Sequence, residues 1–597
     1  MKTKTRALTQ LLLIIFIAIG CIACGGEEVE GGGFAPGLSG SDSAAPNDDL
    51  DPDPDPATEA LTPEEAARFL SQATFGPTQE SIDQLASSSL EAWFTDELDK
   101  TASLHLPYVL ASFGPGEEFL DEKNNVKSDV IYASDSFWLA AIEGDDQLRQ
   151  RMAFALSQIF VISTKSRLDR TPQTVAAYMD VLTEGAFGNY RDLLEEITYS
   201  PAMGVYLTYL RNQKANETIG REPDENFARE IMQLFTIGLV ELNQDGTPVT
   251  DSGGVTIKTY NNEDITGLAK VFTGLSYNHS SYWGSLQELP KEALYQPMVM
   301  FEEHHSPEEK AFLGQFIREG VDGASSISSA LDTLFNHTNV GPFIGRILIQ
   351  RFVTSDPEPA YIERVADAFD AGSYTLPSGD EVGEGRRGDL TATLAAVLFD
   401  EVARDRTTAL ESLSNGKLRE PVIRFTHWAR AFRVNSADAN NEVILRDASS
   451  PKYLAQHPYG SPSVFNFYRP GYVAPGTETG DAGMTVPELQ IFNATSSVGY
   501  PNVLTLFSLG ISPKIEDGFS PAFVPNYSTE ISLAEDAGAL LDHLNLLLTH
   551  GTLREDTRAR IAETLSLIPP NSDEQLLARV QLASVMVMTA PEYIVLR

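Results

Sequence analysis

Residues 223–239 carry the strongest structural signal in the chain and read Pro-Asp-Glu-Asn-Phe-Ala-Arg-Glu-Ile-Met-Gln-Leu-Phe-Thr-Ile-Gly-Leu. If this stretch is helical, four apolar side chains fall on one face, namely Phe227, Ile231, Leu234 and Phe235. Asp224 is well placed to cap the start of the helix, and Gly238 can end it. The spacing therefore predicts an amphipathic helix whose apolar face packs on a core.

The opposite face of this predicted helix carries ionisable groups. Glu225 and Arg229 are four residues apart, and Asn226 and Glu230 repeat this spacing. Each pair can stabilise a helix by a few tenths of a kcal/mol, and such exposed pairs are common on purely structural surface helices. Glu225 and Glu230 would lie about 140° apart around the axis, which is unfavourable for two carboxylates that act on one substrate bond.

Helical signals continue on both sides of this stretch. Thr62-Pro63-Glu64-Glu65 has the pattern of a capping box with proline at the first helical position. Residues 146–163 are apolar around most of a helical circumference, which predicts a central helix. Thr171-Pro172 should open another helix that runs to about Ala186.

Signals for β-strands are few. The best lies in residues 239–259, where Asp245-Gly246 can turn a short hairpin. Residues 434–532 are rich in Pro, Gly, Ser and Asn, which favours long ordered loops with short helices. The predicted fold class is therefore mainly α: one large multi-helix domain over residues 61–597, with long ordered loops and at most a small β-hairpin.

The charge balance excludes one class of partner. The 597 residues include 84 acidic and 43 basic ones, which gives a net charge of −41 with neutral histidine. Such a surface repels phosphate backbones, so we expect no nucleic acid partner. The two cysteines, Cys21 and Cys24, lie near the N-terminus, so the body should contain neither a disulfide nor a thiolate metal site.

The N-terminus has the features of an export signal. Basic residues precede an apolar run at residues 11–19, which is too short for a mature membrane-spanning helix but typical of a signal peptide. Small residues before Cys21 resemble a bacterial lipobox, which predicts a signal peptide at residues 1–20 and membrane attachment through lipid on Cys21, or alternatively on Cys24. An ordinary secretory signal remains open. Neither cysteine precedes Asp, so resemblance to sorted lipoproteins favours the outer membrane.

Residues 21–60 have the composition of a disordered tether. From residue 25 onward this segment contains ten acidic residues and no basic one. It cannot bury enough apolar surface to fold, and its charges repel each other. We therefore expect a spacer between the membrane and the body.

Common catalytic signatures are missing or incomplete. Residues 383–388, Gly-Glu-Gly-Arg-Arg-Gly, match a dinucleotide-binding pattern by letter, but no apolar strand leads into them. We interpret them as a loop before Asp389, which would cap the next helix. The sequence has no HExxH motif, GxSxG elbow or phosphate-binding loop, and its nine histidines are scattered. Metal and cofactor therefore stay open.

Residues 223–239 resemble the hallmark of the bacterial family called domain of unknown function 1800. Similar blocks follow in order along residues 62–597, namely 66–78, 148–158, 200–204, 263–265, 272–274, 341–344, 350–351, 417–421 and 462–468. The resemblance implies an exported, mainly helical protein from a family without an agreed activity. It also implies a possible partner, because members are often encoded beside an exported sulfatase-like family, domain of unknown function 1501.

One block departs from the family pattern. The family usually has a His-Asp pair before a lysine and a Leu-Gly step, whereas this chain has His305-Ser306, then Lys310 and Leu313-Gly314. If the pair binds a metal or moves a proton, a neighbour would have to supply the carboxylate: Glu302, Glu303 or Glu308. His305 also fits a hydrogen-bonded loop histidine.

Two functions follow from these observations. The first, which we favour, is a lipid-anchored cell-envelope protein that binds or assembles with an exported sulfatase-like partner or a surface polymer. The second is a hydrolase or lyase acting on extracellular or envelope polymers, with these candidate groups: Glu225, Glu230 and His305 as acid or base, and Arg229 to hold an anionic group.

The loop at residues 462–472 bears on the choice between these functions. Its aromatic side chains could stack on a sugar or a peptide, or they could belong to the core. They are Phe465, Phe467, Tyr468 and Tyr472.

Overall fold

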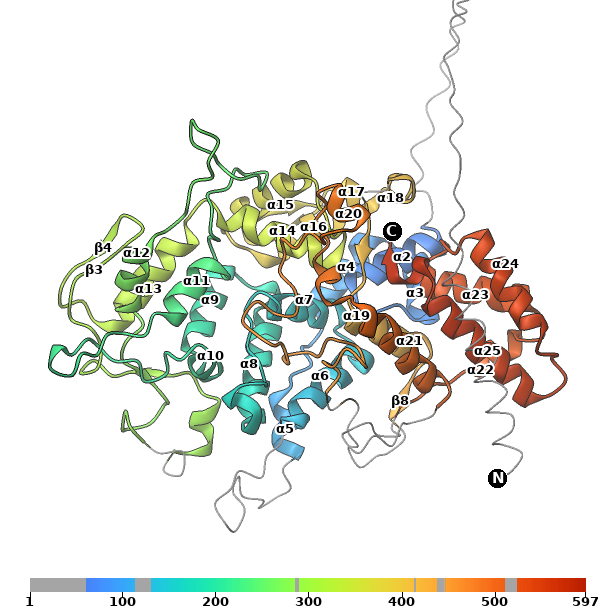
Figure 1. Cartoon of the computed structure of the whole chain (residues 1–597), viewed down its shortest axis with the longest axis horizontal. Helices are drawn as coiled ribbons and strands as arrows, with labels where there is room; N and C mark the ends of the chain where they lie inside the picture. Colours follow the sequence, from blue (N-terminus) through green and yellow to red (C-terminus); the bar gives the residue numbers. More distant parts are fainter. Residues whose placement is uncertain are drawn as a thin grey trace, which may run out of the picture.

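The structure, a computed structural model, consists mostly of helices, which confirms the predicted fold class (Figure 1). It describes residues 61–112, 130–284, 289–412, 415–436, 445, 447–510 and 523–597. The predicted signal peptide, the tether and both cysteines lie outside these residues. Within these ranges no helix combines the length and hydropathy needed to cross a membrane.

The first half of the chain forms the centre and one end of the body (Figure 1). The first helices are α2 (Pro63–Ala73), α3 (Gln79–Ala86), α4 (Leu90–Asp99), α5 (Leu106–Ser112), α6 (Ile131–Glu143), α7 (Gln147–Ser157) and α8 (Pro172–Glu184). The helices toward the left of Figure 1 are α9 (Tyr190–Tyr199), α10 (Pro201–Tyr206), α11 (Asn226–Gln233), α12 (Asn262–Ala269) and α13 (Gly323–Phe335).

The second half covers the upper side and the other end (Figure 1). The upper helices are α14 (Val340–Phe352), α15 (Pro359–Ala371), α16 (Leu390–Phe399), α17 (Glu401–Arg404) and α18 (Arg406–Glu411). The remaining helices are α19 (Pro421–Ala431), α20 (Glu478–Asp481), α21 (Ala494–Ser508), α22 (Ser528–Leu533), α23 (Ala537–Thr549), α24 (Glu555–Ser566), α25 (Asp573–Met588) and α26 (Pro591–Ile594).

Several helix ends follow the predicted local signals. The capping box at the start of α2 is formed, because Thr62 Oγ1 accepts the Glu65 N–H at 3.2 Å and the Glu65 carboxylate accepts the Thr62 N–H at 2.9 Å. Asp389 caps α16 by accepting the Ala392 N–H at 2.9 Å, so the glycine-rich loop before it ends as predicted. Helix α8 begins at Pro172, also as predicted.

The strands are short but form more pairs than the single hairpin expected. In the described residues five antiparallel pairs occur: β1 (Leu275–Ser276) with β2 (Val299–Met300), β3 (Lys310–Phe312) with β4 (Gln315–Ile317), β5 (Tyr374–Thr375) with β6 (Glu381–Val382), β7 (Lys417–Leu418) with β10 (Val595–Leu596), and β8 (Asn435–Ser436) with β9 (Phe523–Val524). Segments this short leave no clear two-residue periodicity in the sequence.

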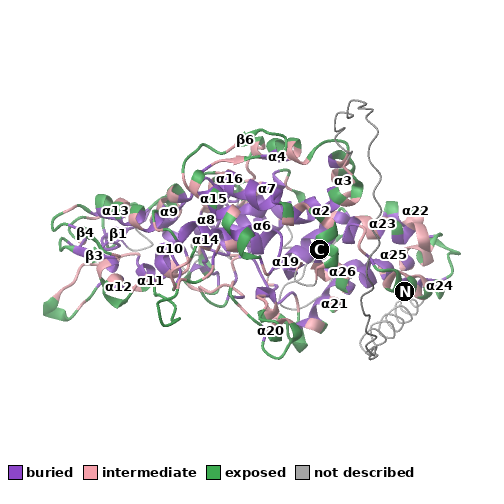
Figure 2. Ribbon diagram, turned by 90° about the horizontal axis from the view of Figure 1, so that it is seen from above, coloured by how far each residue is buried: buried purple, intermediate pink, exposed green. Residues whose placement is uncertain are grey.

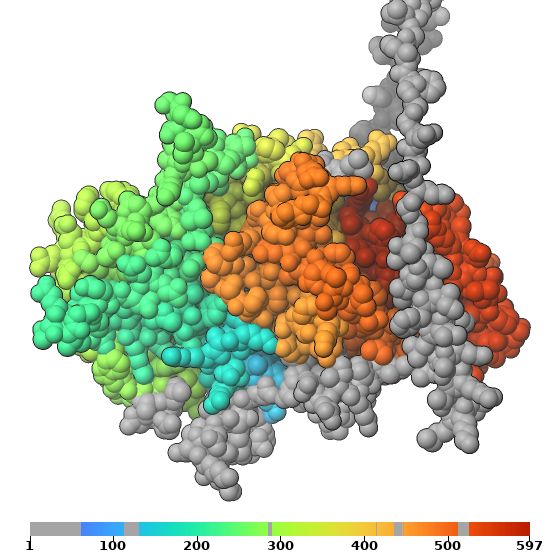
Figure 3. Space-filling model, viewed as in Figure 1, coloured from blue at the N-terminus to red at the C-terminus, as the bar shows by residue number. Residues whose placement is uncertain are grey.

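The hairpin predicted at residues 239–259 is an irregular arm. Isolated antiparallel bridges join Val240 to Lys258, Leu242 to Pro248 and Thr250 to Thr256. The Gly246 N–H donates to the Asn243 carbonyl at 2.9 Å, which forms the predicted turn. This green arm projects from the upper edge of the body (Figures 1 and 3).

One hydrophobic core runs along the body, and buried residues concentrate around α7, α8, α14 and α16 (Figure 2). Helix α7 is central as predicted but ends at Ser157 rather than near residue 163. Beyond it the chain stays buried and bonds to a distant loop, because the Thr164 N–H donates to the Tyr459 carbonyl at 2.8 Å and Ser163 Oγ donates to the Ser461 carbonyl at 2.6 Å. These long-range bonds replace the last predicted helical turn.

Candidate functional site

Glu225 and Arg229 form an exposed pair at the start of α11. Their charged atoms are 3.4 Å apart, and each side chain is about two-fifths exposed. Thr266 Oγ1 on α12 donates to the other Glu225 oxygen at 2.9 Å. An exposed pair of this kind contributes little to stability.

Glu230, one turn further along α11, lies in a different environment. Only 6% of the residue is exposed, and burial raises the pKa of its carboxyl group. Its Oε2 atom has no hydrogen-bond partner among the described residues. The predicted pair with Asn226 is not formed, because the Asn226 amide contacts Thr208 Oγ1 at 3.4 Å instead.

The end of α11 explains why it is shorter than the predicted helix. Helical bonding stops at Gln233, and the N–H groups of Ile237 and Gly238 both donate to the Met232 carbonyl. Gly238 adopts a φ of +69°, a left-handed conformation that favours glycine and ends the turn.

His305 is a buried loop histidine. Its Nδ1 atom lies 2.9 Å from the Thr273 carbonyl, and burial lowers its pKa. Among the described residues no carboxylate bonds to His305 in place of the missing Asp. The Glu302 carboxylate accepts the Gly323 N–H at 3.1 Å, and Glu308 pairs with Lys270 at 2.7 Å. The Nε2 atom of His305 has no hydrogen-bond partner among the described residues.

The predicted acid/base groups therefore do not form one constellation. Glu225 and Arg229 meet each other, whereas Glu230 and His305 occupy separate buried positions without hydrogen bonds to these two. In the ranges that the structure describes, no three His, Cys, Asp or Glu side chains gather in a way that could hold a metal ion. The sequence indicated each of these four residues as a candidate, but it could not indicate how far apart they lie in the fold.

A buried ionic network lies in the middle of the protein. Glu420 is fully buried and accepts hydrogen bonds from the amides of Gln158 at 2.8 Å and Gln456 at 2.9 Å. Lys417 lies 3.8 Å from Glu420 and donates to Glu488 at 2.8 Å. Burial alone would raise the pKa of Glu420. The nearby cations Lys417, Arg151 and Arg351 instead lower it to about 2.

The network supports the loop at residues 462–472. The Tyr468 hydroxyl donates to the Gln158 side-chain carbonyl at 3.2 Å, and the Arg351 guanidinium lies 5.0 Å from the centre of the Tyr468 ring. Tyr468 is therefore a core residue. The other three aromatic side chains of the loop are half-buried. The core interpretation therefore holds for Tyr468, and ligand stacking by the others stays a prediction.

A cavity of about 350 Å³ lies beside this loop. Gln158 at the end of α7 and Gln233 at the end of α11 contribute polar side chains to its wall. Phe343 on α14 and Phe465 on the loop contribute apolar ones, and the exposed Arg469 also lines it. None of the described lining residues carries a carboxylate, an imidazole or a thiol. This cavity suits binding better than acid/base chemistry.

The comparison with protein families settles the relationship of the chain. A family described as "Protein of unknown function (DUF1800)" matches residues 68–595. The chain belongs to this family. The searches of curated proteins and of solved structures found no match.

Four of the DUF1800 blocks recognised in the sequence come together at the cavity. Gln158 belongs to the block at 148–158, Gln233 to 223–239, Phe343 to 341–344 and Phe465 to 462–468. Four segments that are far apart in the chain thus form one wall. We therefore treat this DUF1800 cavity, which we call the aromatic pocket, as the candidate functional site.

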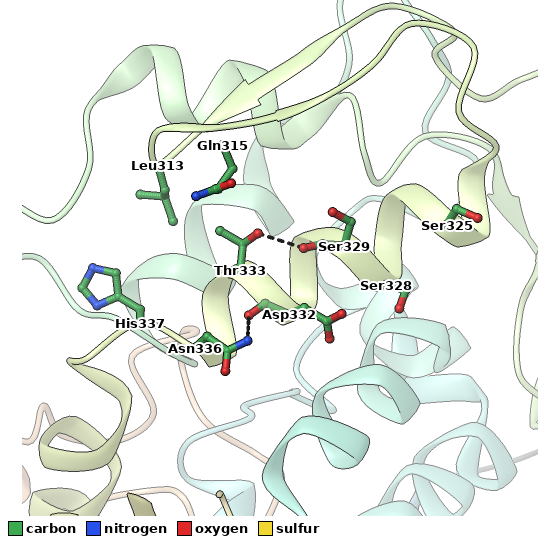
Figure 4. Close-up of a pocket in the computed structure, with 9 residues that line it drawn as sticks. All are labelled: Leu313, Gln315, Ser325, Ser328, Ser329, Asp332, Thr333, Asn336 and His337. Atoms are coloured by element: carbon green, nitrogen blue, oxygen red, sulfur yellow. Dashed lines mark hydrogen bonds between the residues drawn. The ribbon is translucent and has the colours of Figure 1, made fainter.

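A larger and more open pocket of about 730 Å³ lies between the turn after β3 and the polar face of α13 (Figure 4). Its hydroxyl and amide groups mostly serve the helix itself: Thr333 Oγ1 donates to the Ser329 carbonyl at 2.9 Å, and the Asn336 amide donates to the Asp332 carbonyl at 2.8 Å. Asp332 also pairs with Arg191 at 2.6 Å. None of the candidate residues predicted from the sequence lines this DUF1800 surface.

The DUF1800 fold also creates a serine–histidine contact that the sequence did not reveal. Ser134 Oγ lies 3.1 Å from His457 Nε2. His457 Nδ1 accepts the Ala448 N–H at 3.4 Å, so Nε2 carries the proton and donates to the serine. A histidine that activates a serine must instead accept its proton at this atom. The two residues are 323 positions apart, so no local pattern could have indicated the contact.

Proposed function

We propose that this DUF1800 protein is an exported, lipid-anchored protein of the cell envelope that binds an exported sulfatase-like partner through the aromatic pocket. The observation that carries the proposal is the pocket's lining. It combines half-buried aromatic side chains with amide groups and offers no described acid or base. Aromatic anchors in pockets dominate the binding energy of many protein interfaces.

The size of the cavity favours a protein partner over a surface polymer. About 350 Å³ lies at the lower end of the range of ligand pockets, roughly 300–1,000 Å³. A cavity of this size accepts one or two side chains from a partner. Binding of a polymer chain would instead need an extended groove with several aromatic side chains along it.

A binding experiment tests the proposal. Full-length protein in detergent would be titrated by calorimetry with a purified exported sulfatase-like protein from the same genome. We expect Phe465→Ala to weaken binding at least tenfold, because it removes the aromatic wall of the pocket. Phe316→Ala is the matched control, since Phe316 is 69% exposed on β4 and does not line the pocket.

The same preparations distinguish the alternative function. Glu230 is the residue that favours a hydrolase, because a buried carboxyl group with a raised pKa can act as a general acid. Activity on ester or polysaccharide substrates that disappears in Glu230→Gln, with unchanged thermal melting, would support the hydrolase. Partner binding by the parent without such activity would support the proposed binding function.

A further inference from the structure

The mouth of the aromatic pocket carries an arginine that pairs with no acidic side chain of the described residues. Arg469 is exposed, and its guanidinium carbon lies 4.6 Å from the centre of the Phe465 ring. Its backbone N–H donates to Gln490 Oε1 at 2.9 Å, which fixes the start of the side chain. Among the described residues no carboxylate lies within ion-pair distance of its guanidinium.

We propose that the aromatic pocket binds an apolar side chain of an acidic peptide segment, and that Arg469 binds a carboxylate next to that side chain. This inference rests on the proposed function and specifies the chemistry of the partner's contact. A guanidinium that lies over an aromatic ring can still donate hydrogen bonds from N–H groups at its edges. Those edges match the two oxygens of a carboxylate.

The polar wall of the pocket is suited to a peptide backbone. Gln158 has both ends of its amide engaged, with Glu420 on one side and Tyr468 on the other. Gln233 uses its carbonyl oxygen for the Tyr260 hydroxyl at 3.4 Å, while its amide NH₂ donates no hydrogen bond to any described residue. That NH₂ group can donate to a main-chain carbonyl of the bound segment.

The overall negative charge of the protein opposes an acidic partner mainly at long range, whereas the contact at the pocket is local. The net charge of −41 slows the approach of any acidic partner, but charges further than about 10 Å apart are largely screened at 0.1 M salt. The cation at the pocket mouth therefore determines which peptide is held. An acidic segment should bind, and a basic segment of the same shape should not.

Fluorescence anisotropy with labelled synthetic peptides tests the inference on the full-length protein. The probe is Gly-Ser-Asp-Phe-Asp-Ser-Gly, compared with a version that has Lys for both Asp and one that has Ala for Phe. We expect measurable binding of the first peptide and at least tenfold weaker binding of the other two. Arg469→Gln should weaken binding of the first peptide at least tenfold. Arg469→Lys should weaken it less, because lysine keeps the positive charge and lacks only the fork of two parallel N–H groups.

Arg318→Gln is the matched control, because Arg318 is an exposed arginine beside β4 that does not line the pocket. Equal binding of the Lys peptide, or unchanged binding by Arg469→Gln, would overturn the inference. Stronger binding of oleate than of the peptide, with the same dependence on Arg469, would also overturn it in favour of a fatty acid site.

The two proposals can fail separately. If the sulfatase-like partner binds and depends on Phe465, but the acidic peptide neither binds nor competes, the inference is wrong and the proposed function stands. If the acidic peptide binds with the expected dependence on Arg469 and no sulfatase-like partner binds, the inference stands and the proposed partner is wrong.

Discussion

Glu420 shows how much one side chain can depend on its surroundings. It is the acceptor for two amides, lies among three cations and has no surface exposed to solvent. Removing a single charge from such a group leaves the partners buried and unbalanced. The sequence marks Glu420 as part of a family block but gives no sign that its carboxylate is buried.

We expect Glu420→Gln to lower the free energy of unfolding by about 3–5 kcal/mol at pH 7, because it leaves buried cations without their counter-charge. The pKa of Glu420 falls from 4.5 to about 2 on folding, so its contribution is fully present above pH 4.5 and is lost as the pH falls toward 2. Urea unfolding at pH 7 and pH 3 should therefore show a smaller difference between variant and parent at the lower pH.

Glu401→Gln provides the comparison for this experiment, since the Glu401 side chain is 83% exposed. It should change the unfolding free energy by less than about 1 kcal/mol. A Glu420→Gln variant that is as stable as this control would show that the network does not stabilise the fold.

Individual secondary-structure elements were predictable where their signals are local. The capping box at Thr62 and the cap at Asp389 depend on residues within three positions, and both form as predicted. The end of α7 was not predictable, because it depends on bonds to residues near 460. The candidate site shows the same limit: the family blocks were recognisable, but their meeting at the aromatic pocket depends on the packing of the whole chain.

The last strand, β10, is an element whose contribution can be measured. It pairs with β7, and Leu596 is only 2% exposed. We expect Leu596→Ala to lower the free energy of unfolding by about 2–5 kcal/mol, because it leaves a cavity in the core. Leu567→Ala, at a leucine that is 68% exposed, should have little effect. Equal melting temperatures for the two variants would contradict the role of β10.

At the scale of the whole molecule, buried histidines make stability depend on pH. Burial lowers the pKa of His105 and of His457 to about 4. Below pH 6.5 these two histidines bind protons in the unfolded chain but stay neutral in the folded protein until the pH approaches 4. The free energy of unfolding therefore falls as the pH drops from 6.5 toward 4. These two groups contribute roughly 2.5 kcal/mol per pH unit near pH 5.

Burial raises the pKa of Asp180 to about 7. Asp180 therefore binds a proton more readily in the folded state, which opposes the fall in stability that the histidines cause as the pH drops. A comparison between variants isolates the histidines. We expect a double substitution, His105→Gln with His457→Gln, to flatten the decline in melting temperature between pH 7 and pH 5. His279→Gln, at a histidine that is only half-buried, should leave the decline in melting temperature unaltered. An unchanged slope in the double variant would exclude these histidines as the cause.

One hydrogen bond joins segments from opposite ends of the described sequence. Arg68 on α2 donates from Nε to the carbonyl of Arg597 at 3.0 Å across 529 positions. Contacts between residues so distant in the chain form slowly and late. Helix α2 can therefore reach its final surroundings only after residues 529 positions further along the chain have been made. Until then the side chains that α2 buries stay open to chaperones and proteases.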